Sequence, residues 1–495
     1  MTPTSVARIA LFLVFAWLSG CASQYFKDAG APPPVPRYSL EHWPYQEYWT
    51  GIVFNGAKVG FSHLALAPAA DASGRYEIRS EAALALHFLG LEKKISLIAR
   101  DRVNADLTLA DFDYDYNIDG NRQRLHGQVA HDQLTVAVST RGRSETQEHA
   151  LAGAVYPTSI LYLYPLLHGL EVGRAYHYMV FDGETLTVSD ASQKVKGYET
   201  STLFQGAAFK LDTRLHDNST TAWIDSAGRP VFELAMSGVL IAALENEQTA
   251  RRYLAQASLN KQEVLLDFSR VPADRNIPAP RTRRSLDLVL TGLDVAHLPP
   301  ADAFQSCTTA AEETHCRIRS LSPPTTVPAT QSPDAERYLQ PTLAVPSTDP
   351  SLRALAAQIP AGAATDNEKI TRLLGWMQRN IQREPVDSFS ALDVLETRKA
   401  ECQGHAYLYA AFARSLGIPT RVVNGLVYME EAHGFLYHSW NESFVNGTWL
   451  PVDPTFDQVS ADATHVKLIE GESPAQLMPL LDGIGKIRVR VLAYE

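Results

Sequence analysis

The stretch that decides the fold of the C-terminal part spans residues 401–453 and opens with CQGHAYLYAAFARSLGIP at 402–419. Its apolar residues recur at the spacing of one helix face. Gly417 is typical of a left-handed C-terminal helix cap, and Pro419 prevents the helix from continuing. The pattern therefore predicts a helix whose first turn holds Cys402, where unpaired N–H groups and the helix dipole favour a thiolate over a thiol.

Two strand-like runs follow this helix, and Asn446-Gly447 between them is the typical pair of a two-residue hairpin turn. If these two residues form the turn, Trp440 pairs with Asp453. Side chains alternate between the two faces of a strand, so His438 shares the face of Trp440 and lies diagonal to Asp453. The register therefore brings a carboxylate within reach of the imidazole, where it would fix the ring tautomer and stabilise the imidazolium.

Each of these residues has a structural explanation when it is taken alone. A cysteine in an apolar helix is usually a small core residue, and a strand histidine is usually packed or hydrogen-bonded. An aspartate before a proline is often a turn residue. The order of the three and the hairpin register favour instead a nucleophilic site, with Cys402 as nucleophile, His438 as base and Asp453 as orienting acid. His465, further along the chain, is interpreted as a structural histidine.

Four short motifs in this part of the chain carry a resemblance to a known family. They are ALDVL at 391–395, LGIPTR at 416–421, HSW at 438–440 and WLPVDPT at 449–455. With these motifs, residues from about 350 to 470 resemble the transglutaminase-like superfamily, which has a papain-like fold. The resemblance implies the same three roles for Cys402, His438 and Asp453.

Two further features concern the surroundings of the expected nucleophile. The family commonly has a glycine two residues before the cysteine, whereas this chain has Ala400 there, followed by Glu401. A carboxylate beside the thiol would raise the pKa of the thiol if the two groups are close. The backbone N–H of Cys402 would supply part of an oxyanion hole, and we expect the second donor upstream, near 388–390.

The chain of 495 residues is too long for one ordinary domain. We expect an α+β protein with an antiparallel β-rich domain at 41–270, followed by a small β segment and linker at 285–345. A papain-like, transglutaminase-like domain of helices and antiparallel sheet is expected at 349–495. The turn pairs that punctuate the first region include Asn55-Gly56, Asp119-Gly120 and Asp182-Gly183. Strands separated by such turns are typical of an antiparallel sheet, here expected as a curved half-barrel.

The N-terminus predicts the cellular compartment. An apolar run at 9–18 is too short for a typical membrane span and ends in LSGC at 18–21, which resembles a bacterial lipobox. We therefore expect a lipoprotein signal peptide at 1–20, lipidation of Cys21 and a Pro-rich spacer at 21–40. The alternatives are an uncleaved N-terminal anchor and a simple secretory signal.

Ala22 follows the expected lipidation site, which resembles the outer-membrane sorting class of Gram-negative lipoproteins. We therefore expect an outer-membrane lipoprotein that faces the periplasm. That compartment permits disulfides, and Cys307 and Cys316 are close in sequence, so we predict that they pair. Cys402 would then be the only free thiol, as a nucleophile requires.

Composition and motifs limit the class of function. The net charge of −11, without a basic block, argues against a nucleic-acid partner. Motifs typical of zinc sites, phosphate-binding loops, dinucleotide-binding turns and serine-hydrolase elbows do not occur in the sequence, so we expect neither a metal nor a cofactor. The expected partners are a peptide or protein substrate and, through the lipid on Cys21, the membrane.

The expected activity is chemistry at an amide bond. A thioacyl intermediate on Cys402 can be released by water or by an amine, so a protease, an amidase and an acyltransferase all fit the same three residues. The resemblance favours a hydrolase. The alternative is a non-catalytic scaffold or binding lipoprotein that has retained the fold.

Overall fold

The computed structural model describes part of the chain. The described residues are 25–495 apart from 55, 72, 89–90, 141–142, 216–217, 236–237, 253–269, 294–298, 311–312, 321–334, 474–475, 478–479 and 481–484. The predicted signal peptide at 1–20 and the predicted lipidation site, Cys21, lie outside them. Within the described ranges, no helix has both the length and the apolar character that crossing a membrane requires.

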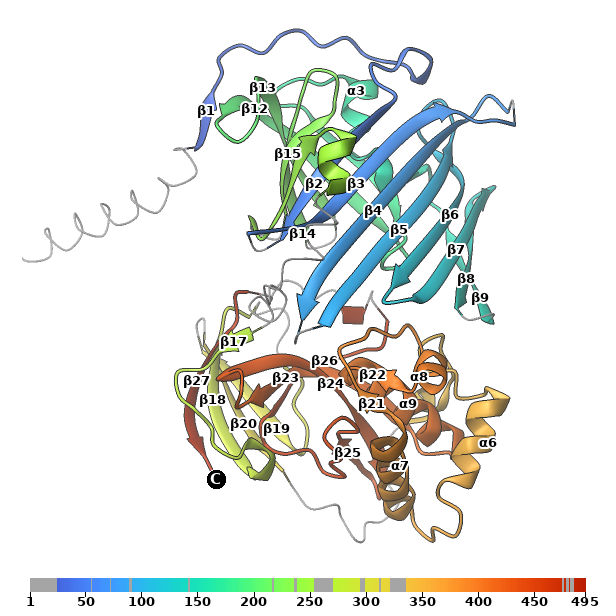
Figure 1. The fold of residues 1–495 in the computed structure, drawn as a ribbon, viewed down its shortest axis with the longest axis vertical. Helices are drawn as coiled ribbons and strands as arrows, with labels where there is room; N and C mark the ends of the chain where they lie inside the picture. The colour runs from blue at the N-terminus through green and yellow to red at the C-terminus, as the bar shows by residue number, and fades with distance from the viewer. Residues whose placement is uncertain are drawn as a thin grey trace, which may run out of the picture.

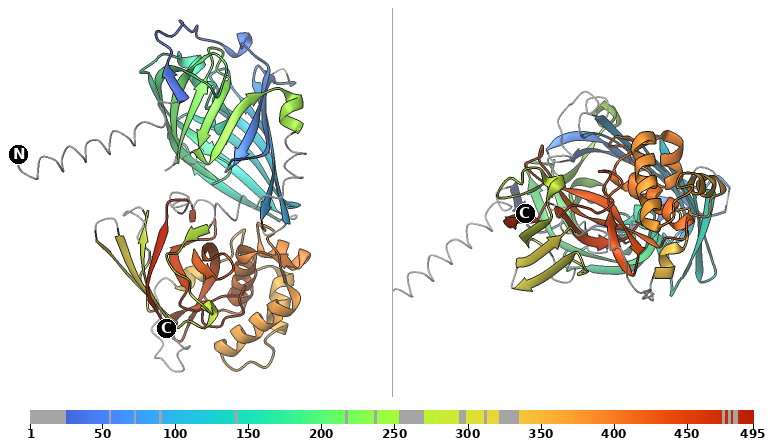
Figure 2. Two further views of the ribbon diagram at one scale, coloured as in Figure 1. Left: turned by 60° about the vertical axis from the view of Figure 1, so that its left-hand side comes forward. Right: turned by 90° about the horizontal axis from the view of Figure 1, so that it is seen from below.

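The N-terminal half forms one large curved sheet (Figure 1). Its strand order is β10-β11-β12-β13-β14-β15-β16-β2-β3-β4-β5-β6-β7-β8-β9, with β1 beside β12. Neighbouring strands are antiparallel apart from the parallel pair β10 and β11, and a second view shows the curvature of the sheet (Figure 2). The strands are β1 (Phe26–Asp28), β2 (Glu47–Phe54), β3 (Ala57–Pro68), β4 (Tyr76–Phe88), β5 (Leu91–Val103), β6 (Leu109–Ile118), β7 (Asn121–Ala130), β8 (Gln133–Thr140), β9 (Arg143–Ala150), β10 (Val155–Pro157), β11 (Ala175–Asp182), β12 (Thr187–Ser201), β13 (Ala207–Leu215), β14 (Asn218–Ile224), β15 (Pro230–Ala235) and β16 (Leu240–Glu245).

The predicted turn between β6 and β7 sets one end of this sheet. Ile118 pairs with Asn121 across the turn, and Asp119 and Gly120 have φ angles of 51° and 89°. Positive φ at both central residues is what a tight hairpin turn of this twist requires, and it explains the Asp-Gly pair. Ile95 of β5 pairs with Ile118, so the β4–β5 and β6–β7 turns lie at the same end of the sheet.

A short apolar segment covers one face of the sheet. The 3-10 helix η2 (Thr158–Ile160) and the helix α3 (Tyr164–His168) place Ile160, Leu163 and Leu166 in the core, where each is fully buried. They pack against sheet residues such as Ile78. This segment is therefore the short core helix that its apolar sequence indicates. One further 3-10 helix, η1 (Leu40–His42), precedes the first long strand.

The C-terminal half combines helices with two larger sheets and one pair of short strands (Figure 1). The sheet orders are β17-β24-β23-β26 with β25 beside β24, β19-β20-β18-β27, and β21-β22. The elements are β17 (Arg270–Pro272), η4 (Pro280–Thr282), β18 (Ser285–Thr291), β19 (Gln305–Ala310), β20 (Glu313–Arg319), η5 (Ala335–Leu339), α6 (Pro350–Gln358), α7 (Asp366–Asn380), β21 (Gln382–Arg383), α8 (Ala391–Thr397), β22 (Lys399–Ala400), α9 (Cys402–Ser415), β23 (Thr420–Met429), β24 (Gly434–Val445), β25 (Thr448–Val452), β26 (His465–Glu470) and β27 (Arg488–Tyr494). Because β17 pairs with β24 and β18 pairs with β27, strands that precede residue 349 are hydrogen-bonded into the C-terminal sheets.

Helices α7 and α8 begin where the sequence provides caps. The Thr365 hydroxyl accepts a hydrogen bond from the Glu368 N–H at 3.2 Å, and the Glu368 carboxylate accepts one from the Ala364 N–H at 2.7 Å. Ser390 and Asp393 form a reciprocal capping box at the start of α8. The predicted apolar stripe of α7 is buried, namely Ile370, Leu373, Leu374 and Met377, and it belongs to the same hydrophobic core as the buried residues of α9.

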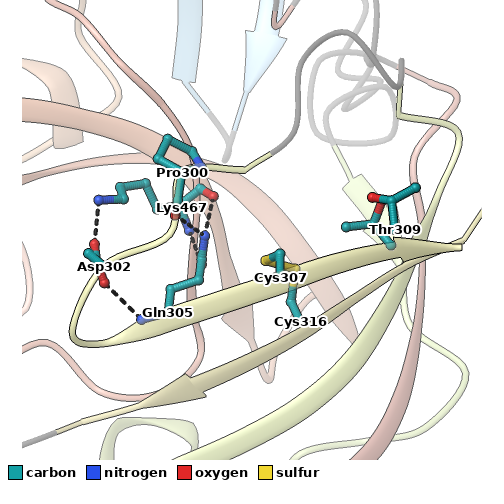
Figure 3. Close-up of a disulfide and its surroundings, with 8 residues drawn as sticks. Pro300, Asp302, Gln305, Cys307, Thr309, Cys316 and Lys467 are labelled. Atoms are coloured by element: carbon teal, nitrogen blue, oxygen red, sulfur yellow. Dashed lines mark hydrogen bonds and ion pairs between the residues drawn. A yellow bond between two sulfur atoms is a disulfide. The ribbon is translucent and has the colours of Figure 1, made fainter.

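A disulfide ties the β19–β20 hairpin. The Cys307 and Cys316 sulfurs are 2.00 Å apart, and the two residues are directly paired across the strands (Figure 3). Beside it, the Gln305 side chain donates to the Lys467 carbonyl at 2.8 Å and accepts from the Lys467 N–H at 2.9 Å (Figure 3). The hairpin is thereby held against β26, the strand that begins at His465.

Candidate active site

Cys402 is the first residue of α9. The preceding residue, Glu401, has extended backbone angles and follows the short strand β22, so the helix starts abruptly at the cysteine. The Cys402 side chain is half-buried and is the free cysteine among the residues that the structure describes. The backbone N–H groups of Gln403 and Ser439 face its sulfur and favour the thiolate. Cys402 therefore lies against β24, beside the residue that follows His438.

The β24–β25 hairpin has the register that the Asn-Gly turn indicates. Val445 pairs with Thr448, and the pairing continues to Asn441 opposite Val452. Extending it by one residue places Asp453 opposite Trp440. In the structure the His438 Nε2 lies 2.8 Å from Asp453 Oδ2, and both side chains are buried. The sequence argument and the structure thus bring the same imidazole and carboxylate together.

The Asp453 carboxylate is held on both oxygens. Oδ1 accepts hydrogen bonds from the N–H groups of Thr455, at 2.7 Å, and Phe456, at 3.2 Å. Oδ2 accepts from His438 and from a second histidine, His465, at 2.9 Å. Burial alone would raise the pKa of Asp453, but the two imidazoles outweigh it and hold the pKa well below its usual range. The carboxylate is therefore ionised and fixed in orientation.

His465 is the site residue whose position the sequence did not reveal. Its Nδ1 lies 3.1 Å from the Asp462 carbonyl and 3.4 Å from the Asp462 carboxylate, while its Nε2 faces Asp453. Burial opposes the charged form, yet Asp462 and Asp453 outweigh it and raise the pKa of His465 to about 9. Arg281 extends the row by an ion pair with Asp462 at 2.9 Å. No short motif marks His465, because it reaches the site through the order of strands β24, β23 and β26.

The electrostatics favour the neutral forms of both Cys402 and His438. Burial, and then the Glu401 carboxylate, raise the pKa of the Cys402 thiol to about 12, against the effect of the facing N–H groups. Burial also lowers the pKa of His438 below 6.5, although Asp453 acts in the opposite direction. The helix N-terminus thus favours the thiolate as expected, but burial and Glu401 have the larger effect.

In the segment 388–390, where we expect the second oxyanion donor, some of the hydrogen-bond donors already have partners. The backbone N–H groups of Phe389 and Ser390 both donate to the Asp393 carboxylate at 2.9 Å. The Ser388 hydroxyl is buried without a hydrogen-bond partner. A Cβ added at Gly404 would lie 3.2 Å from that hydroxyl, so Ser388 packs against the first turn of α9. Of the expected donor segment, Ser388 offers the free hydroxyl nearest to the start of α9.

Two histidines and one aspartate of this site could also hold a metal ion. The candidate donor atoms of His438, Asp453 and His465 all lie within 4.8 Å of one another. In the structure their mutual hydrogen bonds already pair these atoms, and Asp462 holds the other side of His465. The geometry is therefore accounted for by a hydrogen-bonded row of residues.

Comparison with known proteins bears on the same part of the chain. The model of the transglutaminase-like superfamily matches residues 353–454, which confirms the resemblance that the motifs carry. The kyphoscoliosis peptidase of Mus musculus is 26% identical over 129 residues, covering 23% of this chain and 20% of that protein. The Homo sapiens kyphoscoliosis peptidase is 27% identical over 118 residues, covering 21% and 18% respectively. The match thus spans about a fifth of the length of these relatives.

Two solved structures resemble parts of the chain. A proposed cysteine protease from Cytophaga hutchinsonii is 15% identical with a TM-score of 0.29, covering 43% of this chain and 87% of its own. A β-barrel-like protein of a domain of unknown function from Brucella abortus is 10% identical with a TM-score of 0.33, covering 43% and 98%. The segment matched by the family model holds Cys402, His438 and Asp453. Residues 353–454 of this chain form a transglutaminase-like domain.

Proposed function

We propose that the protein is a cysteine enzyme that acts on amide bonds, with Cys402 as nucleophile, His438 as base and Asp453 as orienting acid. The observation that carries this proposal is the 2.8 Å contact between His438 Nε2 and Asp453 Oδ2, on the strand that lies against Cys402. The transglutaminase-like domain and the peptidase names of the relatives support it.

The hydrogen bond to Asp453 assigns the nitrogens of His438. An ionised carboxylate accepts from Nε2–H, so Nδ1 carries the lone pair that can take a proton. The Cys402 sulfur attacks the carbonyl carbon while its proton passes to His438 Nδ1. His438 then gives this proton to the departing amine as the carbon–nitrogen bond breaks, which leaves a thioacyl group on Cys402. Because thiol and imidazole are neutral at rest, proton transfer accompanies the attack.

The oxyanion that forms during the attack needs hydrogen-bond donors. The Cys402 N–H, at the start of α9, is the first donor, and the unpartnered Ser388 hydroxyl is our candidate for the second. Water releases the acyl group in a protease or amidase, and an amine releases it in an acyltransferase. We favour hydrolysis of a peptide or protein substrate.

We also propose that the enzyme works in the periplasm, attached to the outer membrane through lipid on Cys21. The sequence at 18–21 is the basis for the anchor. The Cys307–Cys316 disulfide supports an exported location, because such bonds persist in oxidising compartments. Nucleic acid is not among the proposed partners.

A specific observation favours a second candidate, a non-catalytic scaffold that keeps the fold. Burial and Glu401 raise the pKa of the Cys402 thiol to about 12, which is the behaviour of a structural cysteine. The two candidates differ in whether Cys402 accepts an acyl group with the help of His438.

An active ester tests this without knowledge of the natural substrate. p-Nitrophenyl acetate should acetylate Cys402, shown by the mass of its peptide, and release nitrophenol in a burst followed by slower turnover. The Cys402→Ala variant should show no burst, and His438→Ala should lose turnover. The scaffold is favoured if the wild-type protein shows no acylation beyond that of His438→Ala. The acceptor of the acyl group then separates the two activities: hydrolysis gives the free acid, whereas acyl transfer gives an amide that contains the added primary amine.

A further inference from the structure

The N-terminal sheet places a lysine beside the residue that precedes the nucleophile. The Lys93 Nζ of β5 lies 2.9 Å from Asp387 Oδ1 and 3.9 Å from Glu401 Oε2. The Lys93 side chain is only 9% exposed, so its ammonium is largely removed from water, whereas the Asp387 side chain is 31% exposed. Figure 1 shows the ends of β4 and β5 directed toward the C-terminal half.

A second turn of the same sheet holds the same segment. The Asn121 side chain, at the start of β7, donates to the Asp387 carbonyl, and the Asp387 N–H lies 3.5 Å from the Asp119 carboxylate. Within the C-terminal half, the Glu401 N–H donates to the Val386 carbonyl at 3.3 Å. The segment that holds Val386 and Asp387, and Glu401 directly before α9, are therefore both held against the end of the N-terminal sheet.

The charges at this contact act on the sulfur. Glu401 is, after burial, the largest cause of the raised pKa of Cys402, and Asp453 adds to it. Asp387 and Glu401 share a hydrogen bond. Burial and then Asp387 hold the pKa of Glu401 well above its usual range, although Lys93 acts in the opposite direction. Burial disfavours the Lys93 charge, but Glu401 and Asp387 outweigh it, so the ammonium persists. The lysine is thus the positive charge that balances these carboxyl groups.

We propose that Lys93 is a positioning residue for Cys402: its ammonium holds Asp387 and Glu401 in one arrangement and offsets their negative charge beside the sulfur. The N-terminal sheet then contributes to the active site through the contacts of Lys93 with Asp387 and Glu401. This inference rests on the proposed function, because it concerns the reactivity of Cys402. The positive charge of Lys93 explains how the carboxyl group of Glu401 can stand next to a nucleophile.

The rate at which iodoacetamide alkylates Cys402 in the full-length protein tests the charge balance. The rate is followed by mass spectrometry of the Cys402 peptide between pH 6 and 9. Lys93→Met keeps the apolar stem and removes the charge, and Lys94→Met, on the exposed neighbouring residue, is the matched control. Lys93→Met should lower the rate at a given pH by about tenfold, corresponding to a rise of one unit in the thiol pKa. Lys94→Met should leave the rate unchanged.

The Glu401→Gln variant provides the second arm. Added to Lys93→Met, it should restore the rate to at least the wild-type value, because the uncompensated carboxyl group is gone. Glu401→Gln alone should raise the alkylation rate above that of the wild type. Lys93→Arg, which keeps the positive charge, should retain the wild-type rate. A lost contact that merely loosened the fold would not be reversed by Glu401→Gln. If Lys93→Met does not fold, the single variant Glu401→Gln provides the test. An alkylation rate of Glu401→Gln equal to that of the wild type then overturns the proposal.

The outcomes separate this proposal from the proposed function. Equal alkylation rates in Lys93→Met and Lys94→Met overturn the role of Lys93, even where the ester assay shows turnover that His438→Ala loses. Acylation that does not depend on His438 overturns the proposed function, whatever the lysine variants show. A lower rate in Lys93→Met, reversed by Glu401→Gln, supports the link between Lys93 and the sulfur in either case.

Discussion

His465 Nε2 lies 2.9 Å from Asp453 Oδ2, the oxygen that also receives His438 at 2.8 Å. One carboxylate therefore binds two imidazoles whose pKa values are shifted in opposite directions. His465 is flanked by Asp462 and keeps its proton to a pKa of about 9, whereas burial lowers the pKa of His438 below 6.5. The protonated His465 offsets the charge of Asp453 and leaves His438 neutral, as its proposed role of base requires.

The stability of the fold should depend on the protonation of His465. Its pKa is about 9 in the folded protein and 6.5 as an ordinary value, so its contribution is complete below pH 6.5. The contribution is lost as the pH rises through 9, and its size is about 3 kcal/mol. Urea unfolding from pH 6.5 to 9 should therefore show falling stability in the wild type. His465→Gln should be less stable at pH 6.5 and have a flatter profile, and exposed His177→Gln should follow the wild type. Parallel profiles for His465→Gln and wild type would contradict this role.

Asp453→Asn should abolish most of the activity on the active ester. The amide cannot hold both imidazoles as an anion does, so the tautomer and orientation of His438 are lost. A loss of about 10⁴-fold in turnover is expected from the effect of such a change in other triads. Asp457→Asn, at an exposed residue four positions on, is the control and should remain active. Turnover of Asp453→Asn within tenfold of the control would remove Asp453 from the proposed mechanism.

The disulfide should stabilise the β19–β20 hairpin against unfolding. Closing a loop with a sequence separation of nine residues is worth about 2–3 kcal/mol in the chain-entropy treatment. The double variant Cys307→Ser/Cys316→Ser should unfold at lower urea concentration by that amount. A reducing agent should shift the wild type toward the double variant and leave the double variant unchanged. Non-reduced protein in which both cysteines can be alkylated would refute the pairing.

Gly425→Ala should disturb the strand that supports His438. Gly425 pairs directly with His438, and an added Cβ would meet the Val466 carbonyl and lie 2.9 Å from the Trp440 ring. Such overpacking costs about 1–3 kcal/mol. Urea unfolding should show this loss, together with lower ester turnover, because His438 shifts with its strand. Gly153→Ala, where the space is open, is the control, and equal stabilities of the two variants would show that the sheet can accommodate the methyl group.

Short-range patterns predicted the local structure of the site well. The 402–419 stretch predicted a helix that begins at Cys402, and the structure has α9 at Cys402–Ser415. The Asn446-Gly447 turn predicted the register that joins His438 to Asp453. Both follow from properties of adjacent residues: helical periodicity, the preference of Gly for positive φ, and the twofold alternation of strands.

The same patterns could not predict which distant groups surround the site. Lys93 and Asp387 are 294 positions apart, and they meet because the start of β5 and the start of β7 both contact the segment before α8. Arg281 reaches Asp462 across 181 positions, although its stretch of sequence has the composition of a linker. Contacts of this kind depend on strand order and on how the two halves pack, which nearest-neighbour preferences do not encode.

The sequence by itself thus determined the helix that Cys402 opens and the turn that brings His438 to Asp453, because periodicity and turn chemistry act over a few residues. Only the tertiary structure decided the charge around them. It placed half-buried Cys402 beside Glu401 and His465 beside Asp453, and it brought Lys93 from the other half of the chain. Charge effects depend on distance and burial, and both are set by packing.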